Sequence, residues 1–197
     1  MSSQPNRTLK IVQPNPNVNP ASLRYYDPEL QNAGNREPFD REGFDRAAQN
    51  SRELRKAYLQ QLSGLAPRLS KRTYSLLANP EEPLFDSDLL QFSFGDSLTY
   101  AAKSKRRRRL STTVQAVFRN FHEDALHTLA YEGIESLKVN VPTERWFDMG
   151  QKKIDNLLAH ELTDSDGRQM LHSFLFASGA TVSITFERMN WKTQRIE

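Results

Sequence analysis

The side chains of this sequence that could support acid–base or metal chemistry are four histidines and a scattered set of carboxylates, in a chain without cysteine. Without a thiolate, cysteine nucleophiles and zinc–thiolate sites are excluded. The histidines are His122, His127, His160 and His172. Acid–base catalysis works best with paired groups whose pKa values are driven apart, and no stretch of the sequence brings two such groups together. We therefore predict no catalytic residue and no cofactor.

Two segments hold metal-ligating residue types at short spacing. His122-Glu123-Asp124 precedes His127, but side chains five residues apart on a helix diverge by about 140°, so this set would need a loop to meet on one ion. His160-Glu161 and Asp164-Ser165-Asp166 could add ligands to this set. Asp164-Ser165-Asp166-Gly167 also has the residue order with which a calcium loop begins. The further acidic ligand and the terminal glutamate of a calcium loop are missing, which favours a turn closed by glycine. We predict no metal site.

Positive charge is concentrated in one run within a chain whose formal net charge is +3. The candidate contacts to phosphate or nucleic acid in this run are Lys103, Lys105, Arg106, Arg107, Arg108 and Arg109. Clustered arginines bind phosphates and release counterions. No aromatic pattern of an RNA-binding sheet and no recognition helix accompanies the run. We favour a solvated connection between two strands, whose charge discourages edge-to-edge aggregation.

Known catalytic and nucleotide-binding motifs are missing: the sequence has no G-x-G-x-x-G, no G-x-x-x-x-G-K-[ST], no H-E-x-x-H and no G-x-S-x-G. The first 19 residues lack the apolar segment of a signal peptide, and no apolar run approaches the ~20 residues of a membrane helix. Together with the absence of cysteine, this favours a cytoplasmic protein without a membrane partner. We expect a non-catalytic binding module that holds a protein partner, with nucleic-acid binding through residues 103–109 as the alternative.

The elements that must position these side chains fall into three zones. Residues 1–39 are rich in proline and asparagine and poor in apolar side chains, which predicts a disordered arm. The alternative for this zone is a recognition arm, with Leu23-Arg24-Tyr25-Tyr26 as a strip that docks on a partner.

Residues 40–79 are predicted to be helical. Asp40 is a candidate N-cap for a helix whose apolar stripe has the spacing of one helical face. The stripe consists of Ala47, Ser51, Leu54, Tyr58, Leu62 and Leu65. Gly64 ends or kinks this helix, Pro67 is expected to begin a second, shorter one, and Asn79-Pro80 stops it.

Residues 80–197 are predicted to be an antiparallel β-rich domain with one short helix. Strands are expected at Leu89–Phe94, over Val114, Ala116 and Phe118, and from Ile134 to Val141; Leu126–Tyr131 fits helix or strand. Ile154, Leu157 and Leu158 indicate the short helix. Met170–Ala177 and Thr181–Phe186 flank Ser178-Gly179-Ala180, which predicts a hairpin, with Met189 and Trp191 extending its second strand.

Alternation within the second strand of this hairpin predicts which side is buried. Val182, Ile184 and Phe186 are expected to face the core, whereas Ser183, Thr185 and Glu187 are expected to face water. Helices that precede antiparallel strands define an α+β protein, here with a disordered N-terminal arm.

Overall fold

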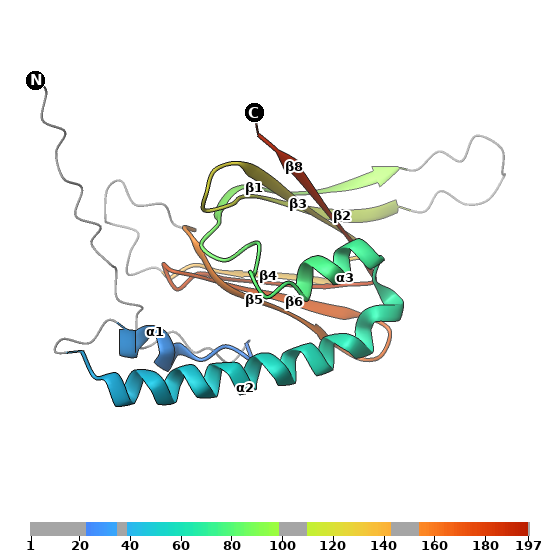
Figure 1. Cartoon of the computed structure of the whole chain (residues 1–197). Coiled ribbons are helices and arrows are strands. Elements are labelled where there is room, and N and C mark those ends of the chain that lie inside the picture. The colour runs from blue at the N-terminus through green and yellow to red at the C-terminus, as the bar shows by residue number, and fades with distance from the viewer. Residues whose placement is uncertain (1–22, 35–38, 99–109, 143–153, 197) are drawn as a thin grey trace, which may run out of the picture.

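The computed structural model describes residues 23–34, 39–98, 110–142 and 154–196, and Figure 1 shows its helices beside two stacked β-sheets. The helical elements are α1 (Pro28–Gly34), α2 (Arg41–Leu65), the 3-10 turn η1 (Ala66–Arg68) and α3 (Lys71–Leu77). The strands are β1 (Asp88–Leu98), β2 (Leu110–Arg119), β3 (Ala125–Glu132), β4 (Ser136–Asn140), β5 (Leu157–Asp164), β6 (Met170–Phe176), β7 (Thr181–Phe186) and β8 (Arg188–Arg195). The predicted α+β class is confirmed.

Local capping signals account for the helices. The side chain of Asp40 accepts a hydrogen bond from the N–H of Gly43 at 3.0 Å, as expected of the N-cap of α2. The second helix begins later than Pro67 predicts: Pro67 lies in η1, and Ser70 caps α3 by accepting from the N–H of Thr73 at 3.0 Å. Figure 1 shows α2 beside the sheet that contains β4, β5 and β6, on the side of that sheet that faces away from the other sheet.

The strands form two four-stranded antiparallel sheets, in the orders β1-β2-β3-β8 and β4-β7-β6-β5. The chain passes from the first sheet to the second after β3 and returns after β7. At the return, the N–H of Glu187 donates to the carbonyl of Glu132 at 3.1 Å. Gly133 turns the neighbouring corner with a φ of +67°, and a Cβ there would lie 2.8 Å from the Glu187 side chain. The sequence-based extension of the hairpin over Met189 and Trp191 is therefore wrong, because these residues belong to β8 in the other sheet.

The core lies between the two sheets. The rings of Phe118 from the first sheet and Phe174 from the second stack with centroids 5.7 Å apart. The predicted β6–β7 hairpin is confirmed, with Gly179 at a φ of +82° and its N–H donating to the carbonyl of Phe176 at 2.8 Å. Such a positive φ is one that glycine adopts without steric cost.

Burial on β7 differs in part from the alternation expected of it. Val182, Ile184 and Phe186 are buried as predicted. Thr185, expected to face water, is only 8 % exposed. Its partner across the strand pair is Ser136 of β4, whose hydroxyl donates to Thr185 Oγ1 at 3.0 Å. This hydrogen bond from the half-buried Ser136 allows the Thr185 hydroxyl to be buried without being left unsatisfied.

The short helix expected at residues 154–158 is wrong. Leu157 begins strand β5, and its N–H donates to the carbonyl of Ser87 at 2.9 Å while its carbonyl accepts from Asp86 at 2.8 Å. This pairing with a distant segment determines the conformation, which local pattern could not reveal. No α-helix occurs in the described part of residues 80–197, and residues 126–131, left open between helix and strand, lie in β3.

The predicted disordered arm is wrong for its last part. Residues 23–34 pack on the domain: Leu23 and Ala33 are buried, and α1 contacts α2. The reason is a set of polar anchors for this segment, described below, which offset the entropy of ordering it. Residues 1–22 and 35–38 of the predicted arm lie outside the described residues.

Candidate functional site

A pocket of about 310 Å³ lies between the N-terminal segment, α2 and β5. Among the described residues that line it, four are aromatic (three tyrosines and a phenylalanine) and four are charged. The lining residues are Tyr25, Tyr26, Asp27, Leu30, Ser51, Arg55, Tyr58, Glu82, Phe85, Leu158, Ala159, His160 and Glu161. We call this the α2–β5 pocket. Ligand sites occupy roughly 300–1,000 Å³, so this pocket suits one long side chain or a small organic molecule.

Glu161 holds the N-terminal wall of the pocket in place. Its carboxylate accepts hydrogen bonds from the backbone N–H of Arg24 at 2.7 Å and of Tyr25 at 2.5 Å. Burial raises the pKa of Glu161, and these amides, with the charge of Arg24 as a smaller effect, act in the opposite direction. The strip Leu23-Arg24-Tyr25-Tyr26, predicted as a docking strip for a partner, is thus bound within its own chain, and both tyrosines line the α2–β5 pocket.

Asp27 fixes the start of α1 at the rim of the same pocket. One of its oxygens accepts from the N–H of Glu29 at 2.9 Å, and the other accepts from the side-chain amide of Asn50 on α2 at 2.6 Å. The side chain is only 9 % exposed. Burial, and next the charge of Asp27, raise the pKa of the neighbouring Tyr26.

Arg55 of α2 supplies the positive charge in the pocket wall. Its guanidinium donates to the carbonyl of Asn79 at 2.8 Å and forms an ion pair with Glu82 at 3.2 Å. It also lies over the ring of Tyr58, 5.4 Å from the centroid, and Tyr58 in turn packs on Tyr25 with ring centroids 5.6 Å apart. Burial raises the pKa of Tyr58 to about 12, so its hydroxyl stays protonated at neutral pH.

A chain of hydrogen bonds runs from the half-buried His160 in the pocket wall into the core. His160 Nδ1 lies 3.0 Å from His172 Nε2, and His172 Nδ1 lies 2.8 Å from the hydroxyl of Tyr131. Burial, and next the charge of Arg55, lower the pKa of His160 to about 4. Burial also lowers the pKa of His172 well below its usual range and raises that of Tyr131 well above it. At neutral pH all three groups are uncharged, so the chain is a neutral hydrogen-bonded network that joins the sheets.

The other two histidines lie apart from the pocket. His127 accepts from the indole N–H of Trp191 at 3.2 Å and lies 3.1 Å from Thr193 Oγ1, inside the first sheet. Burial lowers the pKa of His127, an effect that the charge of Asp124 partly offsets. His122 is exposed in the turn between β2 and β3. The set His122-Glu123-Asp124 with His127 is therefore divided between a surface turn and a buried strand.

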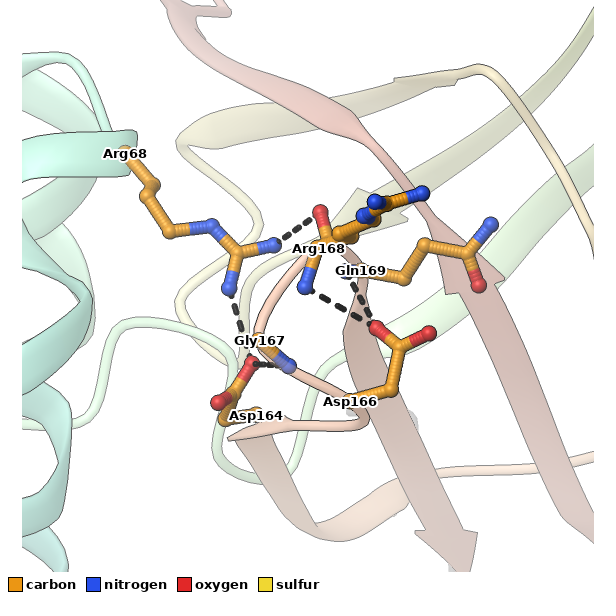
Figure 2. A network of polar contacts seen from close by, with 6 residues as sticks. All are labelled: Arg68, Asp164, Asp166, Gly167, Arg168 and Gln169. Carbon is orange, nitrogen blue, oxygen red and sulfur yellow. Dashed lines mark hydrogen bonds and ion pairs between the residues drawn. The ribbon is translucent and has the colours of Figure 1, made fainter.

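Figure 2 shows how the Asp164–Gly167 segment is used. Asp166 accepts from the N–H groups of Arg168 at 3.0 Å and Gln169 at 2.8 Å, while Asp164 accepts from Gly167 at 3.2 Å and pairs with Arg68 at 2.8 Å. Gly167 has a φ of +80°. The carboxylates close a turn and tie it to η1, as the glycine-closed interpretation predicts. Among the described residues, no group of three or more metal-ligating side chains is positioned to hold an ion.

The candidate phosphate contacts, Lys103, Lys105, Arg106, Arg107, Arg108 and Arg109, lie outside the described residues. The strands on either side are described, and Leu98 at the end of β1 pairs with Leu110 at the start of β2. The basic run therefore belongs to the connection between two paired antiparallel strands. Nothing in the described residues brings it together with the α2–β5 pocket.

Sequence reasoning singled out Tyr25 and Tyr26 as part of a docking strip and His160-Glu161 as possible metal ligands, but it did not place these residues in one site. Arg55 lies on α2, whereas Glu82 and Phe85 lie in the connection between α3 and β1, and only the fold brings these two segments together. One signal was available: Tyr58 and Arg55 are three residues apart on one helix and can meet on one face.

Comparison with models of known protein families finds no match, and comparison with curated protein sequences finds none either. No helix in the described part of the chain has the length and apolar character needed to cross a membrane.

Proposed function

We propose that this protein is a non-catalytic binding module that holds a protein partner, and that the partner docks at the α2–β5 pocket. The observation that carries the proposal is the pocket itself, where four aromatic and four charged side chains surround about 310 Å³. Tyrosine and arginine are the residue types enriched at the energetic centres of protein interfaces. Tyrosine supplies contact area and a hydrogen-bonding hydroxyl at a small cost in conformational entropy.

The pocket wall supports binding because it is already fixed. Glu161, Asp27 and Arg55 each make at least two polar contacts that hold a different element in position. A preformed site does not spend binding energy on ordering its own side chains. The exposed ring of Phe85, at 55 % exposure, provides an apolar rim that a partner can cover.

The test is partner capture by wild-type protein and by a variant with a blocked pocket. Ser51→Trp places an indole in the pocket, whereas Arg52→Trp places the same side chain on the exposed surface one residue further along α2. Immobilised wild-type protein and both variants are exposed to extract of the native host, and captured proteins are quantified. We expect Ser51→Trp to lose the partner and Arg52→Trp to retain it.

Two results would overturn the proposal. Equal capture by the blocked variant and the control would place the partner elsewhere. Turnover of a compound in a metabolite extract, absent with Ser51→Trp and present with Arg52→Trp, would make the pocket an active site.

A second candidate function is nucleic-acid binding through residues 103–109. Its support is the concentration of six basic residues in the connection between β1 and β2. Neutralising Arg106, Arg107, Arg108 and Arg109 with glutamine should weaken an electrophoretic mobility shift strongly and flatten its dependence on salt. Neutralising the exposed Lys192 and Arg195 on β8 is the control. Equal shifts for both variants would exclude the run as the contact.

A further inference from the structure

Among the described residues that line the α2–β5 pocket, negative charge exceeds positive charge. These residues include three carboxylates, those of Asp27, Glu82 and Glu161, and one guanidinium, that of Arg55. The positive charge of Arg55 is balanced by the carboxylate of Glu82, with which it forms an ion pair at 3.2 Å. His160 adds no charge at neutral pH, since its pKa is about 4. The net charge that a ligand would meet is therefore that of the two remaining carboxylates, Asp27 and Glu161.

Those two carboxylates are held by neutral donors. Asp27 accepts from the backbone N–H of Glu29 and the amide of Asn50, and Glu161 accepts from backbone N–H groups of the N-terminal segment. Both side chains are less than 10 % exposed, at 9 % and 4 %. Neutral donors stabilise a carboxylate but leave its charge, which acts over a longer range where water is excluded. The exposed Arg24 is the cation that acts on Glu161, and it does so more weakly than the amides.

The aromatic lining has the chemistry that accompanies cation binding. The faces of tyrosine and phenylalanine carry partial negative charge and attract guanidinium and ammonium groups. The pocket already shows this contact once, since Arg55 lies over the ring of Tyr58 at 5.4 Å from the centroid. Tyr25, Tyr26 and Phe85 line the remaining space.

We propose that the α2–β5 pocket binds a cationic side chain, an arginine or lysine of the partner protein, between its aromatic rings and its buried carboxylates. This rests on the proposed function and names the chemistry of the contact. The long apolar stem of such a side chain would lie against Leu30, Leu158 and Ala159, which also line the pocket. A partner that presents an acidic segment would meet Asp27 and Glu161 and be disfavoured.

The test uses an isosteric pair of probes on the full chain. Isotope-labelled protein is titrated with N-acetyl-arginine amide and with N-acetyl-citrulline amide, which has the same shape but no charge, and backbone amide shifts are followed by NMR. We expect the arginine probe to shift amides in residues 25–30, 51–58, 82–85 and 158–161. We expect the citrulline probe to bind roughly tenfold more weakly or worse, since losing the cation removes both attractions.

Two variants, with one control, test whether arginine binding depends on the aromatic rings and on the carboxylate charge. Phe85→Leu keeps an apolar side chain but removes a ring, and Phe121→Leu makes the same change at an exposed site outside the pocket. Asp27→Asn removes one charge while asparagine can still cap α1. Phe85→Leu and Asp27→Asn should each weaken arginine binding several-fold, and Phe121→Leu should not.

The outcomes separate this inference from the proposed function. Equal affinity for both probes, or arginine shifts confined to other parts of the chain, would overturn the cation site. If Ser51→Trp still abolished partner capture, the docking proposal would stand without it. Conversely, saturable arginine binding in the pocket with partner capture indifferent to Ser51→Trp would support the cation site and refute the docking proposal.

Discussion

The buried histidine chain predicts that this protein loses stability in mild acid. His160 has a pKa of about 4 in the folded protein, against 6.5 when unfolded. Between these pH values the unfolded chain binds more protons at His160 than the folded chain does. The contribution of the neutral His160 to the free energy of unfolding is therefore fully present above pH 6.5 and is lost as the pH drops toward 4. The pKa of His172 is lowered in the same direction, which adds to the effect.

The magnitude follows from the His160 pKa. Each tenfold difference in proton affinity is worth about 1.4 kcal/mol, so His160 alone removes about 2 kcal/mol from the free energy of unfolding at pH 5 and about 3 kcal/mol below pH 4. A domain has roughly 5–15 kcal/mol of stability, so this loss is a substantial part of the total.

Urea unfolding at pH 7.5 and pH 5 measures the loss. His160→Gln removes the titrating ring and should reduce the difference between the two pH values by about 2 kcal/mol. Tyr131→Phe is the matched control, because it leaves the Nδ1 of His172 unsatisfied and should cost about 1–3 kcal/mol at pH 7.5 while both histidines still titrate. Carboxylates also titrate between these pH values, but their contribution is common to the variant and the wild type and cancels when the two pH differences are compared. An unchanged pH dependence in His160→Gln would refute the reasoning.

Three further substitutions probe the packing. Ile184→Ala, at a fully buried site, should cost roughly 2–5 kcal/mol in urea unfolding, whereas Val139→Ala on the paired strand, 50 % exposed, should cost less than about 1 kcal/mol; the reverse order would mean that the register of β7 is inverted. The Cβ of Gly167→Ala meets no neighbour, but alanine there must adopt a φ of +80°, so we expect the free energy of unfolding to fall by about 1–2 kcal/mol. Gly95→Ala is free of that strain and should be neutral or slightly stabilising. Equal losses in the two variants would contradict backbone strain at residue 167. Glu161→Ala leaves the N–H groups of the N-terminal segment unsatisfied and should accelerate proteolysis within residues 23–34, while wild-type cleavage rates there would show that Glu161 does not anchor the segment.

Sequence pattern predicted the elements that local interactions determine. Asp40 caps α2 through a hydrogen bond to a residue three positions along, and the β6–β7 hairpin is closed by Gly179 within its own turn. In both cases the residues that interact are neighbours in the sequence. Their types therefore carry the information needed to predict the structure.

The elements that sequence pattern missed are determined by distant contacts. β5 is a strand because it pairs along its length with β6, and its first residue also bonds to residues 86 and 87. The segment 23–34 is ordered because the carboxylate of Glu161, more than 130 residues away, accepts its amides. His160 and His172 lie on the paired strands β5 and β6, on the face shared with Phe174. No element was predicted over the segment that holds His160, so sequence pattern could not bring the two histidines together.

Hydrogen–deuterium exchange of the protein alone and in complex with its captured partner tests the account most directly. If the partner docks at the α2–β5 pocket, slowed exchange should appear in residues 25–30, 51–58, 82–85 and 158–161, the four segments that line it. The strands of the first sheet should exchange as they do in the free protein. Protection confined to β1 and β2, with the four pocket segments unchanged, would contradict the proposal that this pocket holds the partner.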